Sequence, residues 1–277
     1  MLLDYRLNRD DILERLQRES QDTINAVIID MENWLDGVES STLLVARILQ
    51  QRDYSHEGLL QILRDAVEVN DDIYGAAIAL APNQADPARG FAPYFFRRNG
   101  ELSYANLADP DYNYQAQAWY RDAVAAQSAL WVEPYYDEGG GKILMTTFAV
   151  PVYRESDSGE RFLYAVVTAD VSLAELHDYL QRLRLGSSGF GTLLSRNGTI
   201  LSGRNPANIM RHYSDTIVDE VDHNTWREMF DAALKGQVII RHLTCTDVPG
   251  RCVIRLGTLK STGWPVGVVY SEDEITA

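Results

Sequence analysis

The stretch ILMTTFAVPVY, residues 143–153, is followed after a short polar segment by FLYAVVTADV, residues 162–171. Both runs are rich in β-branched and aromatic residues, which favour strands, and the segment 154–160 between them has the composition of a turn. A helix is predicted directly afterwards, with Ser172 as its candidate N-cap and Glu175 at the third helical position. This order predicts an antiparallel sheet with flanking helices, which is an α+β fold and not a βαβ alternation.

The sequence on either side extends this pattern of strands and helices. Before the pair of strands, strands are predicted at residues 73–80 and 91–98, the second ending in an Asn99-Gly100 turn, and a short helix at 119–127 follows a Tyr-rich, loop-like segment at 104–121. A smaller version follows, with strands at 190–194, 199–202, 237–244, 252–259 and 265–270 and a helix at 224–235. We expect a module boundary near residues 184–189.

Residues 7–50 predict one long helix at the N-terminus. Apolar residues recur there at spacings near three and four, no proline interrupts them, and Gly37 is the only glycine. A helix of this length packs against a partner helix, as in a dimer, or lies across its own domain, and the two interpretations are compatible.

Composition and charge exclude several classes of protein. The chain has 277 residues and a net charge of −15, which repels phosphate backbones, so no nucleic-acid partner is expected. No stretch approaches the ~18–20 apolar residues of a membrane span, and the first residues have no apolar signal-peptide region. The five histidines are scattered without metal-site spacing, so neither a metal nor another cofactor is expected. We expect a cytosolic protein or a soluble part of a longer chain.

The two cysteines, Cys245 and Cys252, flank a Pro249-Gly250 turn signal between strand-like segments. A hairpin would bring both sulfur atoms opposite one another, so a disulfide is predicted, which would indicate an oxidising compartment. Two free thiols are the alternative.

Three segments resemble a known family. They are Tyr112–Tyr120 (YNYQAQAWY), Trp131–Asp137 (WVEPYYD) and Thr168–Leu173 (TADVSL), and with the long helix and Gly263–Val269 (GWPVGVV) they resemble the double Cache (dCache) sensor domains of bacterial transmembrane receptors. The resemblance covers essentially the whole chain, and residues 133–153 look like the version that precedes PPM-type phosphatase and histidine kinase outputs.

The resemblance implies a fold and a setting. We expect a stalk and dimerisation helix at residues 1–54, a membrane-distal, ligand-binding Cache module at 55–185 and a membrane-proximal Cache module at 186–277. The resemblance also implies a periplasmic region of an inner-membrane receptor, a homodimer, and flanking transmembrane helices and a cytoplasmic output domain outside this chain. The expected partner is a small molecule, and the region itself is not expected to be an enzyme.

The resemblance also implies a ligand set. Members that sense amino acids surround the ligand with a Tyr, an Arg, a Trp-Tyr pair and two Asp, which carry over to Tyr112, Trp119, Tyr120, Asp137 and Asp170. The Arg position is Gln117 here, so an α-carboxylate would lose its bidentate partner, and the set resembles an amine site more closely.

The residues support a cation site independently of the family. Seven aromatic residues fall within residues 112–136, and aromatic faces attract cations, while an ammonium group would satisfy two buried carboxylates. The predicted ligand-binding residues are Tyr112, Gln117, Trp119, Tyr120, Trp131, Tyr135, Asp137 and Asp170. The second half shows no comparable set, so no ligand is predicted there.

Several alternatives remain open. The aromatic cluster can be ordinary core, Asp170 can cap the following helix, and Asp137–Gly141 can be an acidic turn whose glycines provide positive φ. Paired acids in an aromatic cleft also suit a glycoside hydrolase. A dimerising structural module with a degenerate pocket is the third class of function.

Overall fold

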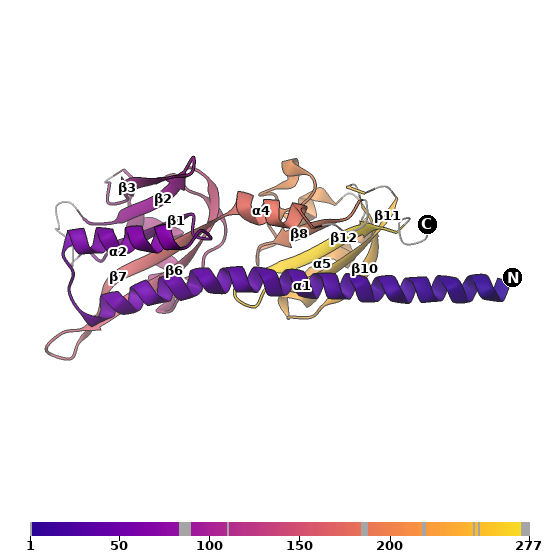
Figure 1. Ribbon diagram of the computed structural model, residues 1–277, viewed down its shortest axis with the longest axis horizontal. Helices are drawn as coiled ribbons and strands as arrows, with labels where there is room; N and C mark the ends of the chain where they lie inside the picture. The colour runs from indigo at the N-terminus through magenta and orange to yellow at the C-terminus, as the bar shows by residue number, and fades with distance from the viewer. Residues whose placement is uncertain are drawn as a thin grey trace. The chain divides into compact units, whose positions relative to one another are not determined.

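The computed structural model describes residues 2–82, 90–109, 111–183, 188–217, 220–245, 247–248 and 250–272, and for residues 2–17, 19, 220 and 221 it describes only the course of the helix. The described chain contains a seven-stranded and a five-stranded antiparallel sheet together with helices (Figure 1). This confirms the predicted α+β class with two antiparallel modules behind a long N-terminal helix. The chain divides into two compact units, Trp34–Leu173, called the first unit below, and Met1–Asn33 with Ala174–Ala277, called the second unit.

The N-terminal helix α1 (Leu2–Gln51) is longer than predicted and contributes to both units. Its predicted apolar stripe is buried inside the chain, because Ile24, Met31 and Leu35 are each at most 1% exposed. In the second unit the helix approaches β11 (Arg251–Thr258) at Gly257, where an added Cβ would lie 2.6 Å from Ile28 Cδ1. The helix therefore lies across its own modules, as one of the two sequence interpretations has it.

The sheet of the first unit has the strand order β3-β2-β1-β7-β6-β4, with β5 also paired to β6. Its strands are β1 (Gly75–Leu80), β2 (Pro93–Arg98), β3 (Glu101–Asn106), β4 (Leu130–Trp131), β5 (Tyr135–Tyr136), β6 (Leu144–Glu155) and β7 (Arg161–Ser172). The helical elements are α2 (His56–Val69), η1 (Tyr114–Ala116) and α3 (Ala118–Ala126). The predicted loop-like segment 104–121 is thus partly wrong, since β3 continues to Asn106 and α3 begins at Ala118.

Side chains alternate between the two faces of this sheet, and the two faces have different neighbours. Ala76 and Ala169 face Val45 of α1 and Leu63 of α2 on one side. Ala77 faces the opposite side, together with Asp170. Because successive strand residues point to opposite faces, one face of the sheet packs against α1 and α2, and the other packs against α3 and forms the site.

The C-terminal end of α1 is held by a residue that the sequence did not single out. Arg154 on β6 donates from Nε to the Leu49 carbonyl at 2.8 Å and from Nη2 to the Arg52 carbonyl at 2.7 Å. Its guanidinium carbon also lies 3.4 Å from the centre of the Tyr164 ring. Arg154 therefore satisfies carbonyls that a helix end leaves without intrahelical partners, and it places a positive charge at the negative end of the helix dipole.

The sheet of the second unit has the order β10-β11-β12-β8-β9. Its other elements are α4 (Leu173–Gln181), β8 (Phe190–Leu194), β9 (Ile200–Ser202), η2 (Pro206–Asn208), η3 (Tyr213–Thr216), α5 (Glu220–Leu234), β10 (Ile239–Thr244) and β12 (Pro265–Ser271). Residues 184–187 of the expected boundary lie outside the described residues. Among the helices that the structure describes, none is long and apolar enough to cross a membrane.

Candidate ligand-binding site

A small cavity of about 10 Å³ lies between the first unit's sheet and α3 and is called the first-unit cavity below. Five of the eight predicted ligand-binding residues line it, and they are Tyr112, Trp119, Tyr135, Asp137 and Asp170. The rest of the lining is Ala77, Tyr94, Leu107, Met145 and Thr168. These residues come from β1, β2, β5, β6, β7, α3 and the loops between them, so the sheet and α3 together form the site.

Asp170 lies in the middle of the sheet, where β7 pairs with Gly75 of β1 and Thr147 of β6. Its Oδ1 accepts a hydrogen bond from Thr147 Oγ1 at 2.7 Å, and Thr147 Oγ1 lies 2.8 Å from the Tyr135 hydroxyl. Since Thr147 gives its proton to the carboxylate, Tyr135 is the donor of the second bond. Asp170 is therefore oriented by a chain of two hydrogen bonds in the strand, and it does not cap α4, which begins only at Leu173.

Burial dominates the electrostatics of this carboxyl group. Asp170 is 2% exposed, and desolvation raises its pKa to about 7, against the lowering effect of the Thr147 hydrogen bond. The nearby charge of Asp137 raises the pKa further, while a hydrogen-bonding contribution from Tyr94 lowers it. Near neutral pH this group is consequently divided between its protonated and ionised forms, and a bound cation would favour the ionised form.

Asp137 holds the turn that follows it. Its carboxylate accepts hydrogen bonds from the backbone nitrogens of Gly139, Gly140 and Gly141 at 3.0, 3.1 and 2.6 Å, respectively. The acidic-turn interpretation is therefore right, and the same residue also lines the first-unit cavity. Its oxygens already accept three backbone hydrogen bonds, so Asp137 has little acceptor capacity left for a ligand.

The three glycines of this turn are not there for positive φ, which corrects the sequence interpretation, because none of them adopts it. Each instead faces an aromatic ring. A Cβ at Gly139 would lie 2.7 Å from Tyr112 Cζ, one at Gly140 would lie 2.7 Å from Tyr94 Cδ1, and one at Gly141 would lie 2.8 Å from Tyr74 Cε1. The triplet lets the turn close tightly over the aromatic wall.

Tyr94 is a lining residue that sequence reasoning missed. Its ring stacks on Phe96, with centroids 5.0 Å apart, and its buried hydroxyl has no hydrogen-bond partner of normal geometry among the described residues. Burial, followed by the charges of Asp170 and Asp137, raises its pKa well above the usual value. Tyr94 pairs with the small residue Ala77 on the neighbouring strand. This pairing would have indicated that Tyr94 lines the cavity, but only the strand register reveals it.

The three remaining predicted residues do not line the cavity. Gln117 donates from Nε2 to the Tyr112 carbonyl at 3.0 Å, and Tyr120 packs edge-on against Trp119, with centroids 5.9 Å apart. Trp131 donates from Nε1 to Glu39 Oε1 on α1 at 2.6 Å, so it links the sheet to the helix. Gln117 and Tyr120 thus support residues that line the cavity, and Trp131 fastens α1.

The described lining includes two carboxylates and no Lys, Arg or His. Trp119 donates from Nε1 to the Tyr112 hydroxyl at 3.3 Å, which fixes the two rings against each other. Such a cavity suits a small positively charged group, because aromatic faces and carboxylates both attract cations. In the described part of the chain no group of three or more His, Cys, Asp or Glu could hold a metal ion.

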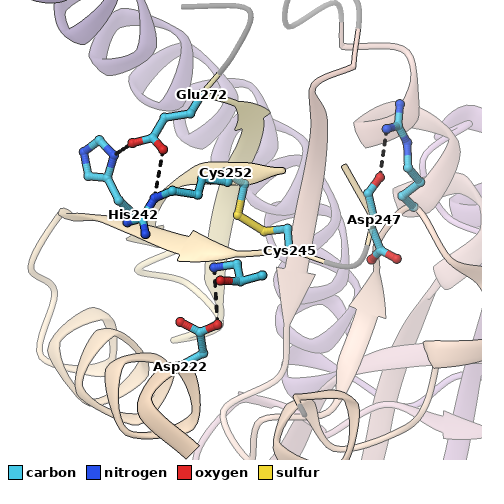
Figure 2. The surroundings of a disulfide bond; sticks show 9 residues. Asp222, His242, Cys245, Asp247, Cys252 and Glu272 are labelled. Carbon is cyan, nitrogen blue, oxygen red and sulfur yellow. Dashed lines mark hydrogen bonds and ion pairs between the residues drawn. A yellow bond between two sulfur atoms is a disulfide. The ribbon is translucent and has the colours of Figure 1, made fainter. Parts of the chain in front are cut away.

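Outside this site, Cys245 and Cys252 form a disulfide, with their Cα atoms 5.8 Å apart (Figure 2). Cys252 lies on β11 and Cys245 directly follows β10, and these two strands pair antiparallel, with Leu243 opposite Cys252. This is the hairpin arrangement on which the sequence prediction of a disulfide depended.

Comparisons with known proteins agree with this architecture. Residues 59–178 match the family model of the methyl-accepting chemotaxis protein-like, first PDC sensor domain. The chain is 25% identical over 253 residues to the methyl-accepting chemotaxis protein McpG of Pseudomonas putida, and this match covers 90% of the chain but only 36% of that protein. The chain therefore spans about a third of the length of this relative.

Two solved structures show the same fold. The extracellular domain of the putative histidine kinase soHK1S-Z6 has a TM-score of 0.77 at 20% identity, covering 97% of this chain and 98% of that one. The ligand-binding domain of the amino acid chemoreceptor PctB of Pseudomonas aeruginosa, in complex with L-Gln, has a TM-score of 0.66 at 18% identity, covering 94% and 92%.

The matched family and these two structures are sensor or ligand-binding domains, so the comparisons give the glycoside hydrolase alternative no support, while a phosphatase output stays a prediction. The resemblance seen in the sequence is confirmed. The chain has the double Cache fold of these sensor domains, and its residues 59–178 match the methyl-accepting chemotaxis protein-like, first PDC sensor domain.

Proposed function

We propose that this chain is the extracytoplasmic sensing region of a bacterial transmembrane receptor and that its first-unit cavity binds a small organic cation. The observation that carries the proposal is the pairing of two buried carboxylates, Asp137 and Asp170, with an aromatic wall and no basic residue in the described lining. A ligand ammonium group would donate to Asp170 and lie against the ring faces.

The first-unit cavity favours an amine over an amino acid. PctB binds L-Gln, which carries an ammonium group and a carboxylate. Here a ligand carboxylate would meet the field of two acids, and Gln117, at the position where the resemblance implies an arginine, is turned toward the Tyr112 carbonyl. The cavity is small, about 10 Å³, so the smallest alkylammonium compounds are the first candidates, and their binding requires the walls to move apart.

The test is a thermal-shift screen followed by calorimetry at pH 8. Each small ammonium compound is paired with a neutral and a carboxylate analogue of equal size. Asp170→Asn is the more specific variant to test. Asp137 also holds the turn that follows it, so removing the Asp137 carboxylate would disturb the fold. We expect at least tenfold weaker ammonium binding in Asp170→Asn, which corresponds to about 1.4 kcal/mol, and unchanged binding in the control Asp157→Asn in the exposed turn at 156–160.

The results separate the competing functions. A carboxylate analogue that binds tightly to Asp170→Asn would refute the cation site. Failure of every compound to bind would favour the structural module with a degenerate pocket.

We further propose that the receptor is a homodimer held by an exposed side of α1. The stripe that the sequence assigned to the dimer is internal, since Ile24 is fully buried, so Ile24→Asp would unfold the domain instead of testing association. The side chain of Leu16 lies outside the described residues. Leu43 and Leu44, at 45% and 60% exposure, are the better candidates.

Sedimentation of wild type, Leu44→Asp and the exposed polar control Ser40→Asp tests this assembly. We expect weaker association only in Leu44→Asp. Association that is equal in all three proteins would place the dimer contact elsewhere.

The proposed setting is the periplasm, and the disulfide supports it, because such bonds persist in oxidising compartments. Ligand binding would act by its differential affinity for two states of the receptor. Arg154 and Trp131 attach the sheet of the first unit to α1 and are the residues through which this change would reach the helix. Flanking transmembrane helices and an output domain belong to the same proposal.

A further inference from the structure

The second unit contains a cavity of about 220 Å³, which is called the second-unit cavity below. Leu194 and Ile254 on its lining are each 1% exposed, whereas Asn205 and Thr244 are exposed, so the cavity runs from the surface into the core. An apolar cavity of about 150 Å³ takes up benzene. The second-unit cavity therefore has room for a benzene-sized ring with a small substituent.

The walls of this cavity are largely aromatic and aliphatic. Phe190 and Tyr213 belong to two separate apolar clusters, and Trp226 of α5 packs against both of them. All three rings line the cavity, and the ring centroids of Tyr213 and Trp226 lie 6.0 Å apart. Water between such walls has few hydrogen-bonding partners, so its displacement by an apolar group favours binding. An aromatic ligand would in addition gain ring-to-ring contacts.

The charged groups around the cavity already have partners in the protein. Asp222 and Asp247 lie on the lining, and neither is unpaired. Asp222 Oδ2 accepts a hydrogen bond from the backbone nitrogen of Thr244 at 3.3 Å (Figure 2). The guanidinium carbon of Arg204 lies 5.3 Å from the centre of the Phe190 ring, and its Nη1 donates to the Asp247 carbonyl at 3.0 Å. Both signs of charge are therefore present beside the cavity.

This balance of charge favours an uncharged ligand, because burying a charge that has no partner of its own is costly. A polar group for such a ligand is available in Asn208. Thr192 Oγ1 on the lining already donates to the Ser202 carbonyl at 2.9 Å, and Asn205 Oδ1 already accepts from the backbone nitrogen of Ala207 at 3.0 Å. The half-buried side-chain amide of Asn208, in contrast, makes no hydrogen bond to the residues that the structure describes. It can therefore donate to a ligand and accept from it.

We propose that the second-unit cavity binds a small uncharged aromatic compound that carries one hydrogen-bonding substituent. The rings of Phe190, Tyr213 and Trp226 receive the aromatic body, and the Asn208 amide bonds the substituent. The proposal rests on the second unit alone and does not depend on the first-unit cavity. Sequence reasoning expected no ligand here, and the lining, gathered from β8, β9, η3, α5, β11 and β12, forms no local motif.

Benzamide, benzoate and the benzamidinium ion test the proposal, because they have nearly the same shape and differ in charge. Each is titrated up to millimolar concentration. Binding is followed by calorimetry and by the methyl NMR signals of Ile200, Ile217 and Ile254, which line the cavity. We expect benzamide to bind at least tenfold more tightly than either ion and to shift these signals.

Two substitutions locate the bound compound. Gly203 lines the cavity, and a Cβ there would meet only Ile200 Cγ2 at 3.8 Å, which is ordinary contact. Gly203→Trp should fill the space and abolish benzamide binding, whereas the matched control Gly203→Ala should retain it. Asn208→Leu keeps the volume of the side chain and removes its amide. Benzamide should bind to Asn208→Leu at least threefold less tightly, while toluene, which has the ring alone, should bind as it does to wild type.

The proposal is overturned if benzamide shifts none of the three isoleucine signals, if either ion binds as tightly as benzamide, or if Gly203→Trp binds benzamide unchanged. Should Gly203→Trp fail to fold, Asn208→Leu decides, because residue 208 is only half-buried and tolerates the change. A lower affinity for benzamide with an unchanged affinity for toluene supports the site. Benzamide affinity that is unchanged, or that falls together with the affinity for toluene, overturns it.

Discussion

Replacing Asp170 by asparagine should stabilise the domain at high pH and change little at low pH. Burial raises the pKa of Asp170 from 3.8 to about 7, a shift of about 3 units at about 1.4 kcal/mol each, so the ionised group costs the folded state on the order of 4 kcal/mol at pH 8. A weaker hydrogen bond from Thr147 to a neutral amide offsets about 1 kcal/mol of that gain. We therefore expect Asp170→Asn to be roughly 3 kcal/mol more stable at pH 8.

The sign of the pH dependence follows from the raised pKa. Below about pH 4 the carboxyl group is protonated in both states, and between pH 4 and 7 the unfolded state loses its proton first, so wild-type stability falls as the pH rises. Urea unfolding of wild type and Asp170→Asn at pH 4.5 to 8 should show a stability difference that grows toward pH 7 and then levels off. Asp157→Asn, an exposed control, should show no such growth. A difference for Asp170→Asn that is constant with pH would refute the reasoning.

Two further substitutions test the packing and the disulfide. Gly140→Ala should lower the free energy of urea unfolding by about 1–3 kcal/mol, because its Cβ would lie 2.7 Å from a Tyr94 ring atom. In the control Gly37→Ala on α1 the new Cβ meets nothing within 4 Å, so the free energy of unfolding should rise by up to about 1 kcal/mol. Equal effects of the two substitutions would contradict the account of the turn. Replacing Cys245 and Cys252 by serine should lower the free energy of unfolding, relative to the oxidised protein, by about 2–3 kcal/mol in the chain-entropy treatment. Thiol titration of unfolded, unreduced wild-type protein exported to the periplasm should find essentially no free sulfhydryl. Two free thiols would contradict the bond.

Local patterns predicted most of the fold. The strands β6 and β7 and the turn between them appear almost at their predicted limits, because long β-branched runs with a polar interruption leave few alternatives. The role of the α1 stripe was harder to predict, since an apolar helix face fits a partner chain and its own sheet equally well. Only the burial of Ile24 and Leu35 decides between them.

The cavity lining was predictable where it follows a motif and not where it depends on pairing. Tyr112, Trp119 and Asp137 fall in segments that the family resemblance covers, whereas Tyr94 enters the cavity through the register of β2 against β1. Trp131 was assigned to the cavity because aromatic density does not reveal direction, and its side chain is turned toward Glu39.

The central claim is that the first-unit cavity takes a cation against ionised Asp170. The most direct measurement is calorimetric titration of the tightest ammonium compound at pH 6 and pH 8, each in two buffers of different ionisation heat. With a pKa of about 7 for Asp170, binding should release close to one proton at pH 6 and few at pH 8, and the affinity should fall about tenfold per pH unit below pH 7. Binding that releases no proton at pH 6, or that is equally tight in Asp170→Asn, would contradict the account.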